Sequence, residues 1–267
     1  MSDREVSIEV DSPIVGKHEA IHTSNNYPSS NLPLTVSIII PVYNEINTIE
    51  PLLTRVRSQN VEFVNLETIV VDDGSDDGTR ELLQNSPHLY DHLIQNQRNL
   101  GKGGAVREGL RKSNADYVLF QDADLEYDPI EYGKLISPIL SFNADVVMGS
   151  RFLAPQWTRV FYFFHKIGNL FICTLFNLLF NTTWTDIYSC YLLFRRELIN
   201  PNELRGNGWE QQAEILGKLC KQKLQLFEVP INYNGRTYEE GKKIRWHHTL
   251  NVIYMIIIAR IFRMGQG

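Results

Sequence analysis

Short apolar runs alternate with amphipathic stretches along the first half of the chain. The runs are rich in β-branched and aromatic residues and are bounded by polar loops, which predicts buried strands. They span residues 36–42, 66–71, 92–95, 117–120 and 145–148. Between them, apolar residues recur at helical spacing, as at Ile49, Leu53 and Val56. This alternation predicts an α/β fold with an open, mostly parallel sheet and helices on both faces.

The alternation stops after Arg151. Two very apolar stretches follow, at 161–180 and 250–262, and further strands are expected at 191–195 and 225–230. Neither apolar stretch contains an uninterrupted run of about 18 uncharged apolar residues, so neither predicts a membrane span. Both suit apolar helices that lie along a membrane interface, and equally helices of the core, and the pattern leaves the two open.

These patterns divide the chain into three parts. Residues 1–33 are polar and lack the basic-then-apolar pattern of a signal peptide, which predicts a flexible lead-in. Residues 34–245 hold the α/β domain, and residues 246–267 are expected to form an amphipathic C-terminal helix.

Composition and charge narrow the class of protein. The 267 residues are 43% hydrophobic and 21% charged, as in a globular chain with a sizeable core. A net charge of −5 disfavours general nucleic-acid binding. The three cysteines, Cys173, Cys190 and Cys220, are far apart in the sequence and form no metal-type pair. We therefore expect a reducing, cytoplasmic compartment and no disulfide framework.

Polar groups follow four of the predicted strands, at the point where each strand ends. In open α/β sheets ligands bind beyond the carboxyl ends of the strands, so these groups are expected to share one site. They are Tyr43 and Glu45, Asp72 and Asp73, Asp122 and Asp124, and Arg151.

Asp122 and Asp124 are candidates for a metal site. Residues two apart in an extended chain point the same way, so these carboxylates and that of Glu126 can converge on one cation. Mg²⁺ and Mn²⁺ favour such oxygen ligands and leave positions for substrate phosphates. An Asp-x-Asp pair alone is also typical of solvated loop residues or helix caps, so the neighbouring strand ends carry the argument.

The glycine-rich turn at 101–104 is a candidate phosphate-binding element. It departs from the dinucleotide-binding pattern at Val106, and the residues after Gly109 depart from the P-loop pattern. A glycine-rich turn that opens a helix still presents backbone N–H groups, and Lys102 adds a positive charge for a diphosphate. The cationic, glycine-flanked block 235–243 suits a loop that closes over an anionic substrate, or a solvated charge cluster.

Taken together, the motifs resemble those of the family 2 inverting glycosyltransferases with the GT-A fold. The branch they resemble most is that of the dolichol-phosphate or polyprenyl-phosphate mannosyl- and glucosyltransferases, and the resemblance covers about residues 35–245. The motifs are 41–45 (PVYNE), 72–75 (DDGS), 99–103 (NLGKG), 122–124 (DAD), 149–151 (GSR), 228–230 (EVP) and 235–243 (GRTYEEGKK).

The resemblance implies a role for each matching residue. Nucleotide contacts are implied for Pro41, Tyr43, Glu45, Asp72 and Asp73, and proximity to the diphosphate for Lys102. Coordination of Mg²⁺ or Mn²⁺ is implied for Asp122, Asp124 and Glu126. Contact with the lipid phosphate is implied for Arg151, for Arg236, and for Lys242 or Lys243. Asp186 is the candidate for acceptor positioning or for a general base.

Two departures from the family pattern lie on the acceptor side. Tyr188 and Leu192 stand where an acidic and a basic residue are expected, and 209–212 (WEQQ) replaces a more usual Phe-Gly-Phe-Glu run. The acceptor is therefore less well defined by the sequence than the donor.

The resulting hypothesis is an enzyme that transfers a hexose from a GDP- or UDP-hexose to a polyprenyl phosphate, with peripheral contact at the inner face of the membrane. Negative charge builds on the leaving diphosphate, where a divalent metal and Lys102 stabilise it. A phosphate acceptor needs cations rather than a base, and Arg151 and Arg236 supply them.

Two alternatives stay open. One is a transferase that acts on a glycan or glycolipid hydroxyl, which needs a carboxylate base. The other is a non-enzymatic nucleotide-sugar-binding protein. The oligomeric state is open as well, with a homo-oligomer as one option.

Overall fold

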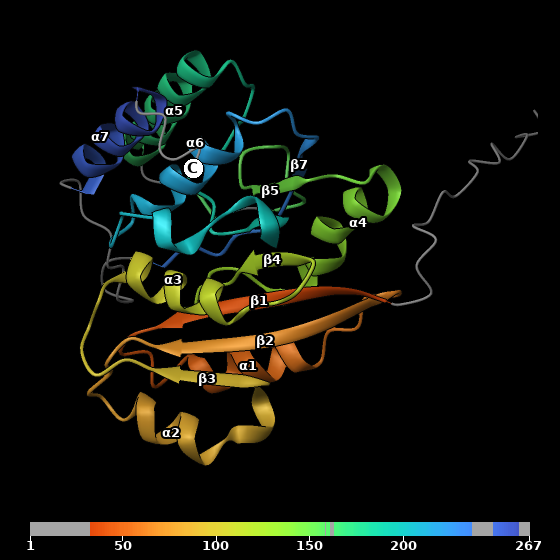
Figure 1. Cartoon of the computed structure of the whole chain (residues 1–267), viewed down its shortest axis with the longest axis vertical. Helices are drawn as coiled ribbons and strands as arrows, with labels where there is room; N and C mark the ends of the chain where they lie inside the picture. The colour runs from red at the N-terminus through yellow and green to blue at the C-terminus, as the bar shows by residue number, and fades with distance from the viewer. Residues whose placement is uncertain (1–32, 158, 161–162, 237–247, 262–267) are drawn as a thin grey trace, which may run out of the picture.

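The computed structural model describes residues 33–157, 159–160, 163–236 and 248–261. A seven-stranded sheet in the order β3-β2-β1-β4-β6-β5-β7 organises them (Figure 1). The strands are β1 (Leu34–Val42), β2 (Val64–Asp72), β3 (His92–Gln95), β4 (Tyr117–Phe120), β5 (Val146–Ser150), β6 (Leu192–Arg195) and β7 (Leu226–Pro230). The helices are α1 (Ile49–Arg57), α2 (Thr79–Asn85), α3 (Lys102–Lys112), α4 (Tyr132–Phe142), α5 (Phe163–Phe180), α6 (Gln211–Leu219) and α7 (His248–Ile261).

The predicted open, mostly parallel sheet is confirmed, with one antiparallel strand. Strands β1, β2, β3 and β4 pair in parallel, as do β5 and β7, whereas β6 runs antiparallel to both of its neighbours, β4 and β5. Strand β6 therefore reverses direction between two strands that point the same way. The carboxyl ends of β1, β2, β4 and β5 consequently meet at the same edge of the sheet.

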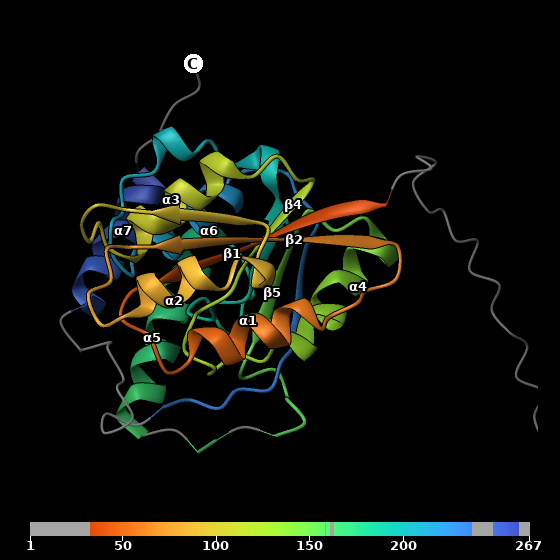
Figure 2. The same ribbon diagram turned by 90° about the horizontal axis from the view of Figure 1, so that it is seen from below.

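Both faces of the sheet are covered, which explains the continuous apolar runs in the sequence. Ile38, Ile39 and Ile40 point alternately to the two faces of β1, and none of them is exposed. Figure 2 shows α1 and α3 on opposite sides of the sheet. A strand that is buried on both faces has no polar alternation, and its period-2 signal is lost.

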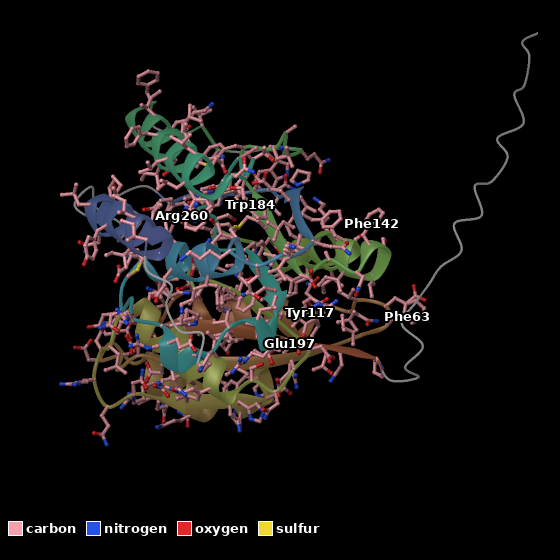
Figure 3. All side chains as sticks on the ribbon, turned by 45° about the horizontal axis from the view of Figure 1, so that its top comes forward. Phe63, Tyr117, Phe142, Trp184, Glu197 and Arg260 are labelled. Atoms are coloured by element: carbon pink, nitrogen blue, oxygen red, sulfur yellow. The ribbon has the colours of Figure 1, made fainter. Side chains whose placement is uncertain are left out.

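Helices α5 and α7 pack on the domain through one face each. Ile172 and Phe176 of α5 are buried, while Leu170 and Phe171 of the same helix are about 60% exposed. Helix α7 contacts α6 and α5. Figure 3 shows α5 and α7 on the other side of the molecule from Phe142. Among the described residues no helix is both long and apolar enough to cross a membrane. The packing does not itself place either helix at a membrane.

Two predicted boundaries fall at the limits of the described residues. The lead-in at 1–33 lies almost entirely outside them, and so does the block from 237 to 247 that contains Lys242 and Lys243. Within 246–267, the structure describes helix α7 over His248–Ile261.

Candidate active site

The strand ends enclose one cleft of about 600 Å³. It lies at the shared carboxyl edge of the sheet, and its walls come from loops that follow β1, β2, β4 and β5. Ten of the residues singled out from the sequence line it: Pro41, Tyr43, Glu45, Asp73, Lys102, Asp122, Asp124, Glu126, Arg151 and Arg236. The predicted convergence of the strand ends therefore holds in three dimensions.

Asp73 fixes the loop that leads into α3. Its buried carboxylate accepts hydrogen bonds from the side-chain amide of Asn96 (2.7 Å) and from the backbone N–H groups of Leu100 (3.0 Å) and Gly101 (2.8 Å). Burial raises the pKa of Asp73, and these hydrogen bonds offset only part of that rise. Asp73 thus shapes the glycine-rich turn as well as lining the cleft.

Asp72 lies behind the cleft. Its fully buried side chain accepts hydrogen bonds from Arg80 Nε (2.7 Å) and from the backbone N–H of Ser75 (3.1 Å), and it is not among the lining residues. The structure therefore brings Asp73, but not Asp72, to the surface of the cleft.

The start of α3 touches the segment that precedes α6. The backbone N–H of Gly103 donates to the carbonyl of Asn207 at 2.7 Å. A Cβ on Gly101 would lie 2.3 Å from the Asn207 oxygen, and a Cβ on Gly103 would lie 2.3 Å from the Gly206 oxygen. Gly101 also has a φ of +83°, a conformation that favours glycine. The glycines thus allow two segments that are about a hundred residues apart to meet.

Lys102 and Asp122 form an ion pair on this wall. Lys102 Nζ lies 2.5 Å from Asp122 Oδ1 and 4.7 Å from the centre of the Trp209 ring. Burial by itself lowers the pKa of Lys102, but the attraction of Asp122 outweighs it and leaves the pKa above its ordinary value. Burial also raises the pKa of the nearby Cys190 thiol, and the charge of Asp122 acts in the same direction. Lys102 is therefore a permanent positive charge in the cleft.

The position of Asp122 is set by the residue before it. Gln121 is fully buried, and its Oε1 accepts hydrogen bonds from the hydroxyls of Tyr132 and Tyr191, both at 2.8 Å. A buried amide that is held from two directions has little freedom to rotate. The loop that carries Asp122 and Asp124 therefore starts from a rigid point.

Asp124, Glu126 and Glu45 surround the guanidinium of Arg236. Arg236 Nη2 lies 3.1 Å from Asp124 and 3.3 Å from Glu45, and its Nε lies 3.6 Å from Glu126. Burial, together with the charges of Asp122 and Glu126, raises the pKa of Asp124 to about 7, and Arg236 acts in the opposite direction. This part of the cleft favours a cation of higher charge than a single guanidinium provides.

The donor set fits a divalent metal that shares its shell with a substrate. Among the described residues, no three His, Cys, Asp or Glu side chains are arranged as a ready metal site. Glu126 already accepts from Tyr233 Oη (2.5 Å) and from the Arg236 backbone N–H (2.7 Å). Mg²⁺ usually binds through one or two protein carboxylates plus substrate phosphates. Asp122 and Asp124 suffice to provide the two carboxylates.

Arg151 and Asp186 form a buried bidentate pair. Arg151 Nε and Nη2 donate to the two carboxylate oxygens at 2.6 and 2.8 Å, and the Arg151 backbone N–H donates at 3.1 Å. Burial lowers the pKa of Arg151, but Asp186 outweighs this and raises it well above its ordinary value. The backbone N–H of Asp186 in turn donates to Glu228 at 3.1 Å. Asp186 thus lies behind Arg151 and is not among the cleft-lining residues.

Several cleft residues were not anticipated from the sequence. The tilted rings of Tyr127 and Tyr233 lie 5.0 Å apart beside Arg151, and only tertiary packing brings them there. Trp209 and Gln211 stood out only as a departure from the family pattern. Apolar positions of α5 and α7, such as Ile172 and Val252, also line the cleft, which therefore extends to both helices.

Comparison with known proteins supports this fold and places the chain in a family. Residues 37–201 match the model of glycosyl transferase family 2. Among solved structures, glucosyl-3-phosphoglycerate synthase from Mycobacterium tuberculosis, determined with Mn²⁺, UDP and glucosyl-3-phosphoglycerate, superposes with a TM-score of 0.65. The superposition covers 85% of this chain and 80% of that one at 20% identity, and it confirms the GT-A fold.

Three relatives are similar in sequence. Glycosyltransferase AglJ of Haloferax volcanii is 32% identical over 76% of this chain and 64% of its own length. The UDP-N-acetylglucosamine–dolichyl-phosphate N-acetylglucosaminyltransferase of Methanococcus voltae is 30% identical over 85% of this chain and 96% of its own length. The dolichol-phosphate mannosyltransferase of Pyrococcus furiosus is 29% identical over 78% of this chain and 59% of its own length. The chain belongs to glycosyl transferase family 2.

Proposed function

We propose that the protein transfers a hexose from a nucleotide sugar to a polyprenyl phosphate at the surface of a membrane. The observation that carries the proposal is that one cleft joins three chemically different surfaces. Acidic strand ends, the buried cation Arg151 and apolar positions of α5 and α7 all line it. The acidic strand ends suit a metal-bound nucleotide sugar, Arg151 suits the acceptor phosphate, and the apolar positions suit an isoprenoid chain.

On the donor side, Lys102 would neutralise the charge that develops on the leaving nucleoside diphosphate. Asp122 and Asp124 would hold Mg²⁺ or Mn²⁺, and a metal bound there adds Lewis-acid stabilisation of the same charge. Tyr43 and Pro41 line the cleft near the Asp73 loop and are suited to contact the nucleotide. The solved relative with Mn²⁺ and UDP, and the relative named for UDP-N-acetylglucosamine, support a nucleotide-sugar donor.

On the acceptor side, the pairing of Asp186 favours a phosphate over a sugar hydroxyl. Both Asp186 oxygens accept hydrogen bonds from Arg151, and Oδ1 also accepts one from the Tyr188 backbone N–H at 3.2 Å. A carboxylate used in this way is poorly placed to take a proton from a hydroxyl. A phosphate is already an anion and needs only a charge that offsets its repulsion from the donor. Two relatives named for dolichyl phosphate support the same acceptor class.

Peripheral membrane contact would bring the lipid to the cleft. The outward faces of α5 and α7 expose apolar side chains, which Figure 3 shows projecting at the edge of the molecule. They are Phe163, Ile167, Leu170, Phe171 and Leu178 on α5, and Leu250, Tyr254, Ile257 and Ile261 on α7. Exposed Lys166 and Arg260 on the same helices suit anionic headgroups, as expected at the inner face of the cytoplasmic membrane.

The test is a transfer assay with the full chain. The protein is incubated with radiolabelled UDP-glucose, UDP-N-acetylglucosamine or GDP-mannose, with Mn²⁺ and a polyprenyl phosphate in detergent or vesicles. We expect organic-extractable label with at least one donor, and none when Mn²⁺ is replaced by EDTA. Label found only on an added glycan or glycolipid would overturn the phosphate acceptor, and binding without any transfer would overturn the enzymatic function.

A further inference from the structure

Helix α6 begins at the wall of the cleft with a buried side chain whose amide nitrogen has no partner among the described residues. This side chain is that of Gln211, the first residue of α6, which is 2% exposed and whose Nε2 forms no hydrogen bond within the part of the chain that the structure describes. The same residue lines the cleft. An amide N–H group that is kept from water without an acceptor destabilises the fold, so such a group calls for an explanation.

The surroundings of Gln211 define which part of a substrate it faces. On one side Gln211 packs on the first turn of α3, where a Cβ on Gly103 would lie 2.9 Å from the Gln211 Cβ. Lys102, in the same turn, contacts both Asp122 and Trp209. Gln211 therefore lies next to the diphosphate end of the proposed donor site.

On the other side, the start of α6 is tied to the segment 186–190. The amide of the neighbouring Gln212 donates to the backbone carbonyls of Ile187 (3.3 Å) and Ser189. This segment begins at Asp186, which holds Arg151, and ends at Cys190, which lines the cleft together with Asp122. It therefore runs from the proposed acceptor cation to the diphosphate end of the donor site.

The transferred sugar must lie between these two ends. In a direct displacement the anomeric carbon stands between the oxygen that attacks and the diphosphate oxygen that leaves. The wall built from segment 186–190 and the start of α6 runs along that interval. Gln211 is consequently a neighbour of the sugar ring and not of the nucleotide base, which is expected near the Asp73 loop.

We propose that Gln211 is a sugar-recognition residue whose Nε2 donates a hydrogen bond to an oxygen of the transferred sugar, with Trp209 beside it on the same wall. The inference rests on the proposed function for the identity of the donor. It explains why the amide is left without a protein partner, because the substrate supplies the acceptor. It also gives a use to part of the segment 209–212, in which the sequence departs from the pattern of the family.

The test compares the binding of nucleotide sugars with that of the matching nucleoside diphosphates. The full chain is titrated calorimetrically, in the presence of Mn²⁺, with UDP, GDP, UDP-glucose, UDP-N-acetylglucosamine and GDP-mannose. The variant Gln211→Leu removes the donor group and keeps an apolar side chain of similar size, and Gln211→Met serves as a second variant if the first one folds poorly. We expect the affinity for the preferred sugar nucleotide to fall about 10-fold, and that for its nucleoside diphosphate to change by less than about twofold.

A matched control is available in the chain. Gln95 on β3 also has an Nε2 without a hydrogen-bond partner among the described residues, but it does not line the cleft. Gln95→Leu should leave both affinities unchanged. Monodeoxy analogues of the preferred donor then identify the oxygen, since one of them should bind weakly to the wild-type protein and lose nothing further in Gln211→Leu.

The outcomes separate this inference from the proposed function. Equal losses for sugar nucleotide and nucleoside diphosphate, no loss for either, or no binding of any of the five probes would overturn the role of Gln211. Selective loss of the sugar nucleotide, together with a wild-type protein that never labels polyprenyl phosphate, would leave the sugar contact standing and overturn the lipid acceptor alone.

Discussion

Arg236 and Asp124 form an ion pair across the cleft, with Nη2 of the arginine 3.1 Å from Oδ2 of the aspartate. The two residues are 112 positions apart in the sequence, and the arginine occupies one oxygen of a carboxylate that is also a proposed metal ligand. A guanidinium and a divalent cation cannot occupy that place together. Binding of metal and donor would therefore release Arg236, which could then serve the acceptor phosphate.

Replacing Arg236 with Gln should strengthen metal binding in the absence of donor. Removal of the competing charge is expected to raise the affinity for Mn²⁺ about 10-fold, a coupling of ordinary size between two ligands of one site. The affinity can be measured by electron paramagnetic resonance of free Mn²⁺. The matched control is Arg55→Gln, which removes an exposed ion pair with Asp128 outside the cleft. Unchanged Mn²⁺ affinity in Arg236→Gln would contradict the competition.

Asp124→Asn should remove metal-dependent transfer and leave the fold intact. Loss of one group that stabilises the developing charge is expected to lower the turnover by about 10²–10³-fold. Transfer is measured with labelled donor, Mn²⁺ binding by titration, and the melting temperature by circular dichroism. Retained activity in the variant would show that the acidic loop has another role.

The buried pair between Arg151 and Asp186 makes a prediction about stability. Asp186→Asn leaves a buried guanidinium without its counter-charge and should lower the free energy of unfolding by about 3 kcal/mol, which urea denaturation can measure. The double variant Arg151→Gln/Asp186→Asn should lose less than the sum of the two single losses. If Asp186 were instead a general base, Asp186→Asn would abolish transfer and leave the stability unchanged.

The exposed face of α5 should control binding to vesicles. Phe171 on α5 and Phe142 on α4 are equally exposed, at 61%. In Figure 3 the ribbon of α5 and the labelled Phe142 lie on different sides of the molecule. Phe171→Ser is expected to weaken binding to anionic vesicles, measured by co-sedimentation, about 30-fold, which corresponds to roughly 2 kcal/mol for a buried aromatic side chain. Phe142→Ser is the control and should bind as the wild type does. Equal binding by all three proteins would rule out α5 as the contact surface.

The cysteines should react slowly with iodoacetamide in the folded protein. Burial raises the pKa of Cys173 and Cys220 to about 11, and that of Cys190 well above its ordinary value. Only the thiolate reacts, so at about pH 8 the rates of Cys173 and Cys220 should be roughly 200-fold lower than in the urea-unfolded chain, and they should rise about tenfold per pH unit below the pKa. Mass spectrometry of alkylated peptides gives both rates. A rate in the folded protein that equals the rate in urea would contradict the burial of these thiols.

Much of the donor side could be predicted from the sequence, because parallel strands that are buried on both faces produce a recognisable local sequence pattern. The residues 117–120 and 69–71 form continuous apolar runs, and the polar residues that follow each run mark the edge of the sheet. The sequence alone therefore predicts that the strand ends share a site. Tyr43, Lys102 and Asp124 all line the cleft as that reasoning predicts.

The acceptor side depends on contacts between distant residues, which no local sequence pattern reveals. Strand β6 enters antiparallel between β4 and β5, and nothing in Leu192–Arg195 reveals its orientation. Asp186 reaches Arg151 only through this arrangement, so its pairing could not be inferred from spacing. The same holds for Gln211, since a single glutamine in a polar segment gives no sign that folding will bury it.

The contact between the glycine turn of α3 and the segment before α6 has a consequence for how the protein tolerates change. The space between Gly103 and the Gly206 carbonyl has no room for even one methyl group. Gly103→Ala would therefore act as a wedge that separates the wall bearing Lys102 from the wall bearing Gln211, although every charged group would keep its identity. At this contact, glycines that take part in no charge interaction therefore limit which substitutions the site accepts.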